Sequence, residues 1–407
     1  MENITFYNID WKDYLNNYPD LKKNNIDSKE KCYNHWIKYG IKENRKCNII
    51  TLKKNNNKSN INIIGYFHYN FGVAKNAHNF HDLLDYHDIE HNIYNIDCCS
   101  HKKHNSDVLD YSYCDYSNST NIFILVDENN IKKLINHVKN NFENCINIIY
   151  YVIEVKNQEL NVIKYLDFFN KIFVNSQYCK DIISIKDKSV ISVFPLVPII
   201  PKFMKNIPYQ SKIVLFYMCD TLSCIYRKNI YGFLSVVDFF SKYKNKYFFI
   251  LKIINFTPSK ELKNSDYYEI NNLIIKLSKI NLLVIDFFML ENELNKIMDI
   301  CDIYLSMHRS EGFGYTLYEI SQKNKYIIST NYSAPNEYLK NYSKFIPIKY
   351  TLIKTSNFKN SLYYNFDSEW CEPDINDCIN KIKNILINKN IPNLILDVNN
   401  IKNLINI

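Results

Sequence analysis

Apolar runs of strand length alternate with amphipathic segments of helix length over most of the chain. The first series comprises Ile61–Phe67, Asn121–Val126, Asn147–Ile153, Lys171–Asn175 and Val190–Phe194. Segments with helical periodicity separate these runs, near 73–85, 129–141, 158–169 and 176–184. Strands spaced by helix-sized intervals favour a parallel sheet with crossover helices.

A second series of apolar runs follows a proline-rich stretch. Its runs are Lys212–Met218, Tyr247–Ile254, Leu282–Phe287, Asp302–Met307 and Lys325–Thr330, and helices are predicted near 374–389 and 398–406. Between the two series lie four of the ten prolines, at positions 195, 198, 201 and 208, which indicates a stiff hinge. The pattern predicts an α/β protein with two doubly wound, Rossmann-like domains, at 61–200 and 201–392, and a helical tail at 393–407.

The first 60 residues have a different pattern. Aromatic residues at helical spacing occur over 10–45, and two of the three tryptophans, Trp11 and Trp36, fall there. This indicates a small helical module at residues 1–48 with its own packed core. A polar, Asn- and Lys-rich stretch at 49–60 is typical of a linker.

Composition narrows the classes of partner. The net charge of +8 comes from 50 basic and 42 acidic residues that are mixed along the chain, so a dedicated nucleic-acid binder is not favoured. The small excess of basic residues is compatible with a basic site for a diphosphate, and equally with a lysine-rich surface that binds no ligand. Residues 1–10 lack a signal-peptide pattern, no apolar run is long enough to span a bilayer, and the twelve cysteines include no C-x-x-C pair. We expect a cytoplasmic protein with reduced thiols, no transmembrane segment and no zinc site.

The strongest candidate site lies between His308 and Glu319. The chain has only six glycines, and two of them, Gly312 and Gly314, fall here between a predicted strand and a predicted helix. Such a turn lets the backbone approach a ligand, and the helix that follows suits a pyrophosphate. Glu311 and Glu319 each carry a carboxylate that can accept hydrogen bonds from hydroxyl groups. One carboxylate could face a sugar and the other a ribose. The alternative is a glycine turn with surface glutamates.

Two further clusters follow predicted strands. Arg227 and Lys228 come after the run Lys212–Met218, where cations can hold a diphosphate and stabilise it as it departs, although Arg-Lys pairs also occur on solvated surfaces. Gly72 and Val73 come after Ile61–Phe67, in the first βα turn of the N-terminal domain, where an open α/β sheet places a ligand crevice. No G-x-G-x-x-G fingerprint and no D-x-D pair occurs, so neither a dinucleotide nor a carboxylate-bound divalent metal is predicted.

At these residues the sequence resembles a glycosyltransferase of the large retaining family often called group 1 or family 4, over about 60–390. The resemblance rests on four segments: Ser306 to Glu319 for an E-x7-E element, Arg227-Lys228-Asn229 with Gly232 for R-K-N-P-x-G, Thr330-Asn331-Tyr332-Ser333, and Trp370-Cys371-Glu372-Pro373-Asp374. Ile230 replaces the proline of the second segment. Residues 10–45 resemble a short module found attached to bacterial and giant-virus glycosyltransferases, and the composition suits a giant-virus source.

The resemblance implies a GT-B fold, with two Rossmann-like domains facing a cleft, and a retaining glycosyl transfer without metal or cofactor. The donor is a nucleotide-sugar and the acceptor a glycan or a protein, in a host cytoplasm if the source is viral. The implied catalytic residues are Glu311, Lys228 and Arg227. The implied donor-binding residues are His308, Gly312, Phe313, Gly314, Tyr315, Glu319 and Asn331.

The acceptor half departs from the family pattern. Where relatives often have G-x-G-E-A-A-R, this chain has Gly72-Val73-Ala74-Lys75-Asn76-Ala77-His78, and Leu222 replaces a common arginine before Lys228. Two other interpretations stay open: a catalytically silent GT-B protein that binds a sugar nucleotide or a partner enzyme, with 1–48 as its docking piece, and a GT-B sugar epimerase.

Overall fold

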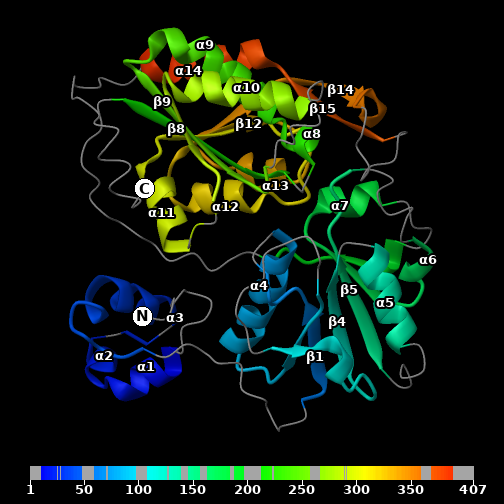
Figure 1. Ribbon diagram of the computed structural model, residues 1–407. Coiled ribbons are helices and arrows are strands. Elements are labelled where there is room, and N and C mark those ends of the chain that lie inside the picture. Colours follow the sequence, from blue (N-terminus) through cyan, green and yellow to red (C-terminus); the bar gives the residue numbers. More distant parts are fainter. Residues whose placement is uncertain are drawn as a thin grey trace. The chain divides into compact units, whose positions relative to one another are not determined.

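The computed structural model of the protein describes residues 11–24, 26–27, 29–47, 59–69, 72–97, 108–125, 128–138, 145–155, 163–183, 188–196, 212–221, 224–256, 266–287, 289, 291–358 and 368–387. The chain divides into two compact units, Met1–Lys202 and Phe203–Ile407 (Figure 1). Each unit contains a parallel sheet flanked by helices, which confirms the predicted α/β class with two Rossmann-like domains. The predicted helix near 398–406 and most of the proline-rich hinge lie outside the described residues.

The N-terminal segment of the first unit is helical. It contains α1 (Trp11–Asn17), α2 (Asp20–Lys23), α3 (Lys29–His35) and a π-helical turn (Trp36–Gly40). The buried ring of Tyr14 meets Trp36 edge to face at 5.8 Å between centroids, and its hydroxyl lies 3.1 Å from His35 Nδ1. A Cβ at Gly40 would lie 2.9 Å from the Trp36 ring, so this close approach requires glycine. Tyr14, Tyr33 and Trp36 are therefore buried in the core of this segment, whereas Tyr39 is exposed.

The first sheet has seven strands in the order β3-β2-β1-β4-β5-β6-β7, all paired in parallel. In chain order the strands are β1 (Ile61–Gly65), β2 (Asn92–Asn95), β3 (Leu109–Asp110), β4 (Thr120–Leu125), β5 (Ile146–Tyr151), β6 (Lys171–Val174) and β7 (Ile191–Val193). The helices are α4 (Gly72–Tyr86), α5 (Glu128–Val138), α6 (Ile163–Leu166) and α7 (Gln177–Ile182). All five predicted strands are present, and β2 and β3 are additions.

The two faces of this sheet carry separate cores, because successive strand residues point to opposite sides. Ile63 packs in one cluster with Phe80 of α4. Its neighbour Ile64 packs in another cluster with Leu134 of α5. Figure 1 shows α4 on one side of the sheet and α5 with α6 on the other.

The second unit has a six-stranded parallel sheet in the order β10-β9-β8-β11-β12-β13 and a separate antiparallel pair, β14-β15. In chain order the strands are β8 (Ile213–Asp220), β9 (Tyr247–Ile254), β10 (Leu282–Ile285), β11 (Ile303–Ser306), β12 (Tyr326–Thr330), β13 (Phe345–Ile348), β14 (Tyr350–Lys354) and β15 (Glu369–Pro373). The helices are α8 (Ile225–Lys228), α9 (Ile230–Phe240), α10 (Asp266–Ser278), α11 (Glu291–Ile300), α12 (Tyr315–Gln322), α13 (Pro335–Leu339) and α14 (Ile375–Ile387). The sequence did not predict β13, β14 or β15.

The order of these strands fixes where a ligand can bind. Strands β8 to β10 extend to one side and β11 to β13 to the other, so β8 and β11 are adjacent without being consecutive. In Figure 1, α9, α10 and α14 cover one face of the sheet and α11, α12 and α13 the other. Open α/β sheets bind ligands beyond the carboxyl ends of the strands at such a switch point. The loops after β8 and β11 are therefore the expected site.

None of the helices within the described ranges combines the length and the apolar character that a membrane crossing requires.

Candidate functional site

The loops that follow β8 and β11 are joined at the switch point of the second sheet. The loop after β8 leads into α8, which ends with Arg227 and Lys228. The loop after β11 carries Glu311 and leads into α12. The backbone N–H of Arg309 donates to the carbonyl of Arg227 at 2.8 Å. Two clusters that the sequence offered separately are therefore parts of one site.

Local backbone conformation presents Lys228 at the end of α8. Asn229 follows in the left-handed region with φ 52°, and its side chain accepts a hydrogen bond from the N–H of Gly232 at 3.0 Å, which caps α9. A Cβ at Gly232 would lie 2.7 Å from Asn229 Nδ2. The buried Tyr217 hydroxyl donates to the carbonyl of Lys228. The Arg-Lys-Asn…Gly segment is thus a sharp junction between two helices.

The Glu311 loop is held by the turn that follows β12. The N–H of Glu311 donates to Ser333 Oγ at 2.9 Å, and the N–H of Ala334 donates to the carbonyl of Glu311 at 3.3 Å. Gly314, with φ 78°, immediately precedes α12 and is the one described glycine in the left-handed region. Gly312 therefore does not supply the unusual backbone conformation that the paired glycines suggested.

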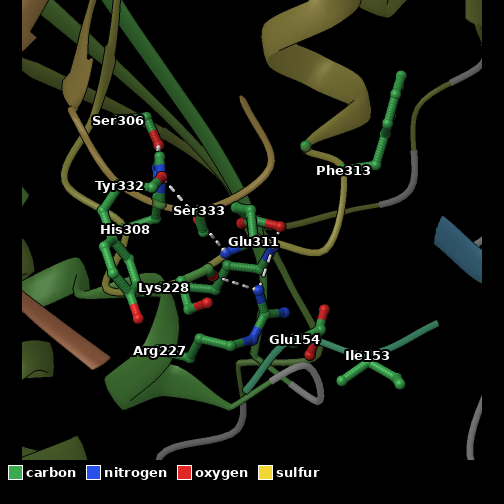
Figure 2. Close-up of polar contacts among 12 residues, drawn as sticks. Ile153, Glu154, Arg227, Lys228, Ser306, His308, Glu311, Phe313, Tyr332 and Ser333 are labelled. Carbon is green, nitrogen blue, oxygen red and sulfur yellow. Dashed lines mark hydrogen bonds and ion pairs between the residues drawn. The ribbon is translucent and has the colours of Figure 1, made fainter. Parts of the chain in front are cut away.

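Glu311 forms ion pairs with both cations of the other loop (Figure 2). Its Oε1 lies 2.6 Å from Lys228 Nζ and its Oε2 lies 3.1 Å from Arg227 Nη1. The same Nη1 donates to the carbonyl of Ser310 at 2.8 Å. Burial alone would raise the pKa of Glu311, but the charges of Lys228 and Arg227 outweigh it and hold the pKa at about 2. The carboxylate is therefore ionised at neutral pH.

His308 lies fully buried at the base of the same loop. Its Nδ1 is 3.0 Å from Ser306 Oγ and its Nε2 is 3.4 Å from the carbonyl of Tyr332 (Figure 2). Burial lowers the pKa of His308 to about 4, so the ring is neutral at pH 7. A tautomer protonated at Nε2 donates to Tyr332 and accepts from Ser306. Both ring nitrogens of this predicted donor-binding residue therefore have partners inside the protein.

Phe313 and Tyr315 belong to an aromatic cluster beside the loop. The Phe313 ring centroid lies 5.0 Å from that of Tyr315 and 5.3 Å from that of Tyr338. The Tyr338 hydroxyl donates to the carbonyls of Phe313 and Gly314, at 2.9 and 3.0 Å. Figure 2 shows the Phe313 side chain directed away from Glu311. The Phe313 ring therefore takes no part in the ion pairs of Glu311. Its backbone belongs to the same loop, two residues after Glu311.

Glu319 and Asn331 have different surroundings. Glu319 is buried in the second turn of α12. Asn331 is exposed after β12, where its N–H donates to the carbonyl of Ile348 at 3.1 Å. It lines an open groove of about 450 Å³ together with Lys349, Lys381 and neighbouring residues.

In the first unit, Gly72 and Val73 do not form a loop. They are the first two residues of α4, and a Cβ at Gly72 would meet no atom within 4 Å. The backbone there does not require glycine, so the predicted βα turn is not marked by a conformation that only glycine can adopt. Both residues nevertheless follow β1, at the β1–β4 switch point of the first sheet.

Sequence reasoning missed a clamp between the Glu311 loop and β15. Arg309 donates to Glu372 through Nε at 2.8 Å and Nη2 at 2.9 Å, and through Nη1 to the carbonyl of Tyr226 at 2.5 Å. Its guanidinium lies 4.5 Å above the ring of Phe358. The N–H of Cys371 donates to the carbonyl of Arg309 at 3.1 Å. The sequence did contain a signal for this clamp: two of the motif segments carry opposite charges, Arg309 in one and Glu372 in the other.

Within the ranges that the structure describes, no three His, Cys, Asp or Glu side chains form a group that could hold a metal ion.

No protein-family model and no curated protein matches the sequence. Among solved structures, a UDP-forming α,α-trehalose-phosphate synthase from Burkholderia xenovorans is similar, with 7% identity and a TM-score of 0.52 over 82% of this chain and 92% of that one. A variant of TarM from S. aureus, solved with UDP, has 15% identity and a TM-score of 0.47 over 67% of this chain. The match covers 49% of TarM, so this chain spans about half its length. The lipopolysaccharide outer core galactosyltransferase WaaB has 12% identity and a TM-score of 0.45, over 70% of this chain and 85% of that one. At these identities the likeness is one of fold, and the fold is GT-B, with two Rossmann-like domains.

Proposed function

We propose that the protein is a retaining, hexosyltransferase-like glycosyltransferase that moves a sugar from a nucleotide-sugar to a glycan or protein acceptor, without a metal ion or cofactor. The observation that carries the proposal is the contact between Lys228 and Glu311 at the β8–β11 switch point, directly before α12. Here a cation, a carboxylate and a helix N-terminus lie within two adjoining loops.

These groups match the parts of a nucleotide-sugar. The first N–H groups of α12 have no partner within the helix, and with Lys228 they can bind a diphosphate. Glu311 can accept hydrogen bonds from two sugar hydroxyls, and Glu319 from the ribose hydroxyls. Backbone N–H groups of Phe313 and Gly314 adjoin the diphosphate in this arrangement.

The reaction needs charge stabilisation and orientation rather than a protein nucleophile. The bond between the sugar C1 and the phosphate oxygen breaks, and its electron pair stays on the diphosphate. The acceptor oxygen attacks C1 on the same face and its proton passes to the departing phosphate oxygen, so configuration is retained. Lys228 stabilises the growing diphosphate charge, and Glu311 holds the sugar in place.

Metal independence is supported by the charge already present. In glycosyl transfers that use a divalent cation, the ion can balance the charge of the leaving diphosphate. Lys228 and the N-terminus of α12 can balance that charge, and the chain has no D-x-D pair to bind a metal.

The fold likeness adds support without carrying the proposal. The structure that shares the fold over 82% of this chain is UDP-forming by its name. Because one fold hosts many functions, the proposed activity rests on the geometry of the site.

A panel of nucleotide-sugars tests donor binding directly. A ligand at one hundred times its dissociation constant should stabilise the folded chain by about 2.7 kcal/mol, which thermal denaturation detects. Stabilisation by one or more nucleotide-sugars that Glu311→Gln reduces relative to stabilisation by the matching nucleoside diphosphate supports the proposed site. If no member of the panel stabilises the wild-type chain, the proposal is wrong.

A further inference from the structure

The two cations that hold Glu311 differ in freedom. The Arg227 side chain is 1% exposed and also bonds the carbonyl of Ser310 at 2.8 Å. The Lys228 side chain is 17% exposed and lies at the end of α8. Arg227 is therefore fixed beneath the loop, whereas the Lys228 ammonium is a point charge on a flexible stem that can turn toward a ligand.

The Lys228–Glu311 contact conflicts with diphosphate binding. An anion that binds Lys228 brings its own negative charge beside the Glu311 carboxylate, which is only 12% exposed. Like charges in a partly buried site repel, and water cannot screen them there. Either Lys228 leaves Glu311 when the diphosphate arrives, or the diphosphate binds weakly.

We propose that Glu311 is an exchangeable counter-ion of Lys228: the donor diphosphate takes Lys228 from Glu311, Arg227 alone then holds Glu311 against the sugar, and Glu311 returns to Lys228 when the product leaves. This inference rests on the proposed function and assigns Arg227 a positioning role, not a contact with the donor. Hydrogen bonds from the sugar hydroxyls to the Glu311 carboxylate replace the contact that Glu311 loses with Lys228. A bare nucleoside diphosphate offers no such compensation, so the exchange favours donor over product.

The electrostatic interactions of Glu311 agree with separate roles for Lys228, which moves to the diphosphate, and Arg227, which stays with Glu311. Although burial alone would raise the pKa of Glu311, Lys228 and Arg227 each lower it. Arg227, whose Nη1 lies 3.1 Å from Glu311 Oε2, still favours the ionised carboxylate after Lys228 has moved to the diphosphate. His308 also acts on Glu311, and its ring is neutral at pH 7 because burial lowers its pKa to about 4. The Tyr217, Tyr304, Tyr338 and Cys219 side chains interact with Glu311 too, and burial raises the pKa of each.

Binding of inorganic pyrophosphate and of UDP to the full chain tests the exchange, measured by calorimetry at low salt with EDTA. Glu311→Gln should bind pyrophosphate about tenfold more tightly than wild type, because Lys228 no longer has to leave a carboxylate, a contact worth about one factor of ten. The gain should vanish in the Lys228→Ala background. Glu369→Gln, which removes a carboxylate from an exposed pair with Lys354, should change affinity less than about twofold.

Several results would overturn the exchange. A Glu311→Gln affinity equal to that of wild type would do so, as would a gain that persists without Lys228 or appears equally in Glu369→Gln. If Glu311→Gln does not fold because Arg227 loses this ion pair, Glu311→Asp replaces it. Aspartate keeps a charge for Arg227 but is one methylene shorter, so it should also tighten pyrophosphate binding.

Arg227→Lys tests the positioning role. It should raise KM for the nucleotide-sugar about tenfold while changing pyrophosphate affinity less than about twofold, because the defect acts through Glu311. An equal loss for donor and pyrophosphate would mean that Arg227 contacts the diphosphate itself.

The two proposals fail in different ways. A wild-type chain that binds neither UDP nor pyrophosphate and turns over no donor contradicts the proposed function, and the exchange with it. A chain that turns over a donor, yet shows no gain in Glu311→Gln, contradicts the exchange alone.

Discussion

Burial of His308 should make the stability of the C-terminal domain depend on pH. Its ring is fully buried between Ser306 and Tyr332, and its pKa is lowered to about 4 from the ordinary 6.5. Burial is the main cause, the charges of Lys228 and Arg227 act in the same direction, and Glu311 with the Tyr332 carbonyl opposes them. The folded state therefore binds this proton less readily than the unfolded chain does.

The size of the effect follows from this difference in pKa. A depressed histidine pKa contributes stability above pH 6.5, and this contribution is lost as the pH falls from 6.5 to about 4. At 1.36 kcal/mol per unit, the full span is about 3 kcal/mol. Between pH 7 and pH 5 the free energy of unfolding should fall by about 2 kcal/mol because of His308.

Urea denaturation monitored by tryptophan fluorescence can measure this. Trp370 is buried in β15, so a chain with Trp11→Phe and Trp36→Phe reports on the C-terminal unit. His308→Asn in this background should show a pH dependence weaker by about 2 kcal/mol over the same range. Staying at pH 5 or above keeps Glu311 ionised in most folded and unfolded molecules. Equal pH dependence in the two proteins would refute the buried neutral histidine.

Four further outcomes are expected. Lys228→Ala should lower kcat by about 10²–10³-fold and raise KM less, since its contact strengthens as the bond breaks; steady-state kinetics decides, and a KM effect alone would contradict this. Gly314→Ala should destabilise the C-terminal unit by about 1–2 kcal/mol in urea, because φ is 78° and the new Cβ would lie 3.0 Å from Pro335; an unchanged midpoint would contradict this. Turnover should survive EDTA, and activity restored by manganese would show a metal requirement. A chain that starts near residue 55 should fold and bind donor as the full chain does, and loss of donor binding in a folded product would count against an independent N-terminal module.

The strands that the sequence predicted are those with unbroken apolar runs. β8 and β9 are buried along nearly all of their length and could not be missed. β2, with the sequence Asn-Ile-Tyr-Asn, is short and partly polar, and β14 is exposed at most positions, so neither has the period-two or continuous apolar pattern. Those elements are fixed by the neighbours with which they pair.

The candidate site was predictable in its parts but not in its contacts. The sequence placed Lys228 and Glu311 after β8 and β11, and parallel strands bring those loops to one edge. It could not show that the two residues, 83 positions apart, pair with each other, or that Arg227 lies behind them. It also could not show that both nitrogens of His308 are used internally, because burial and partners depend on tertiary packing.

The most direct test of the central claim is release of nucleoside diphosphate from a panel of nucleotide-sugars, with EDTA present and no acceptor added. A glycosyltransferase with a working donor site should hydrolyse at least one donor slowly, and Lys228→Ala should reduce that release by at least about a hundredfold. A chain that binds a donor but releases no diphosphate from it would be a catalytically silent GT-B protein. That result, or a release rate that Lys228→Ala leaves unchanged, would contradict the account.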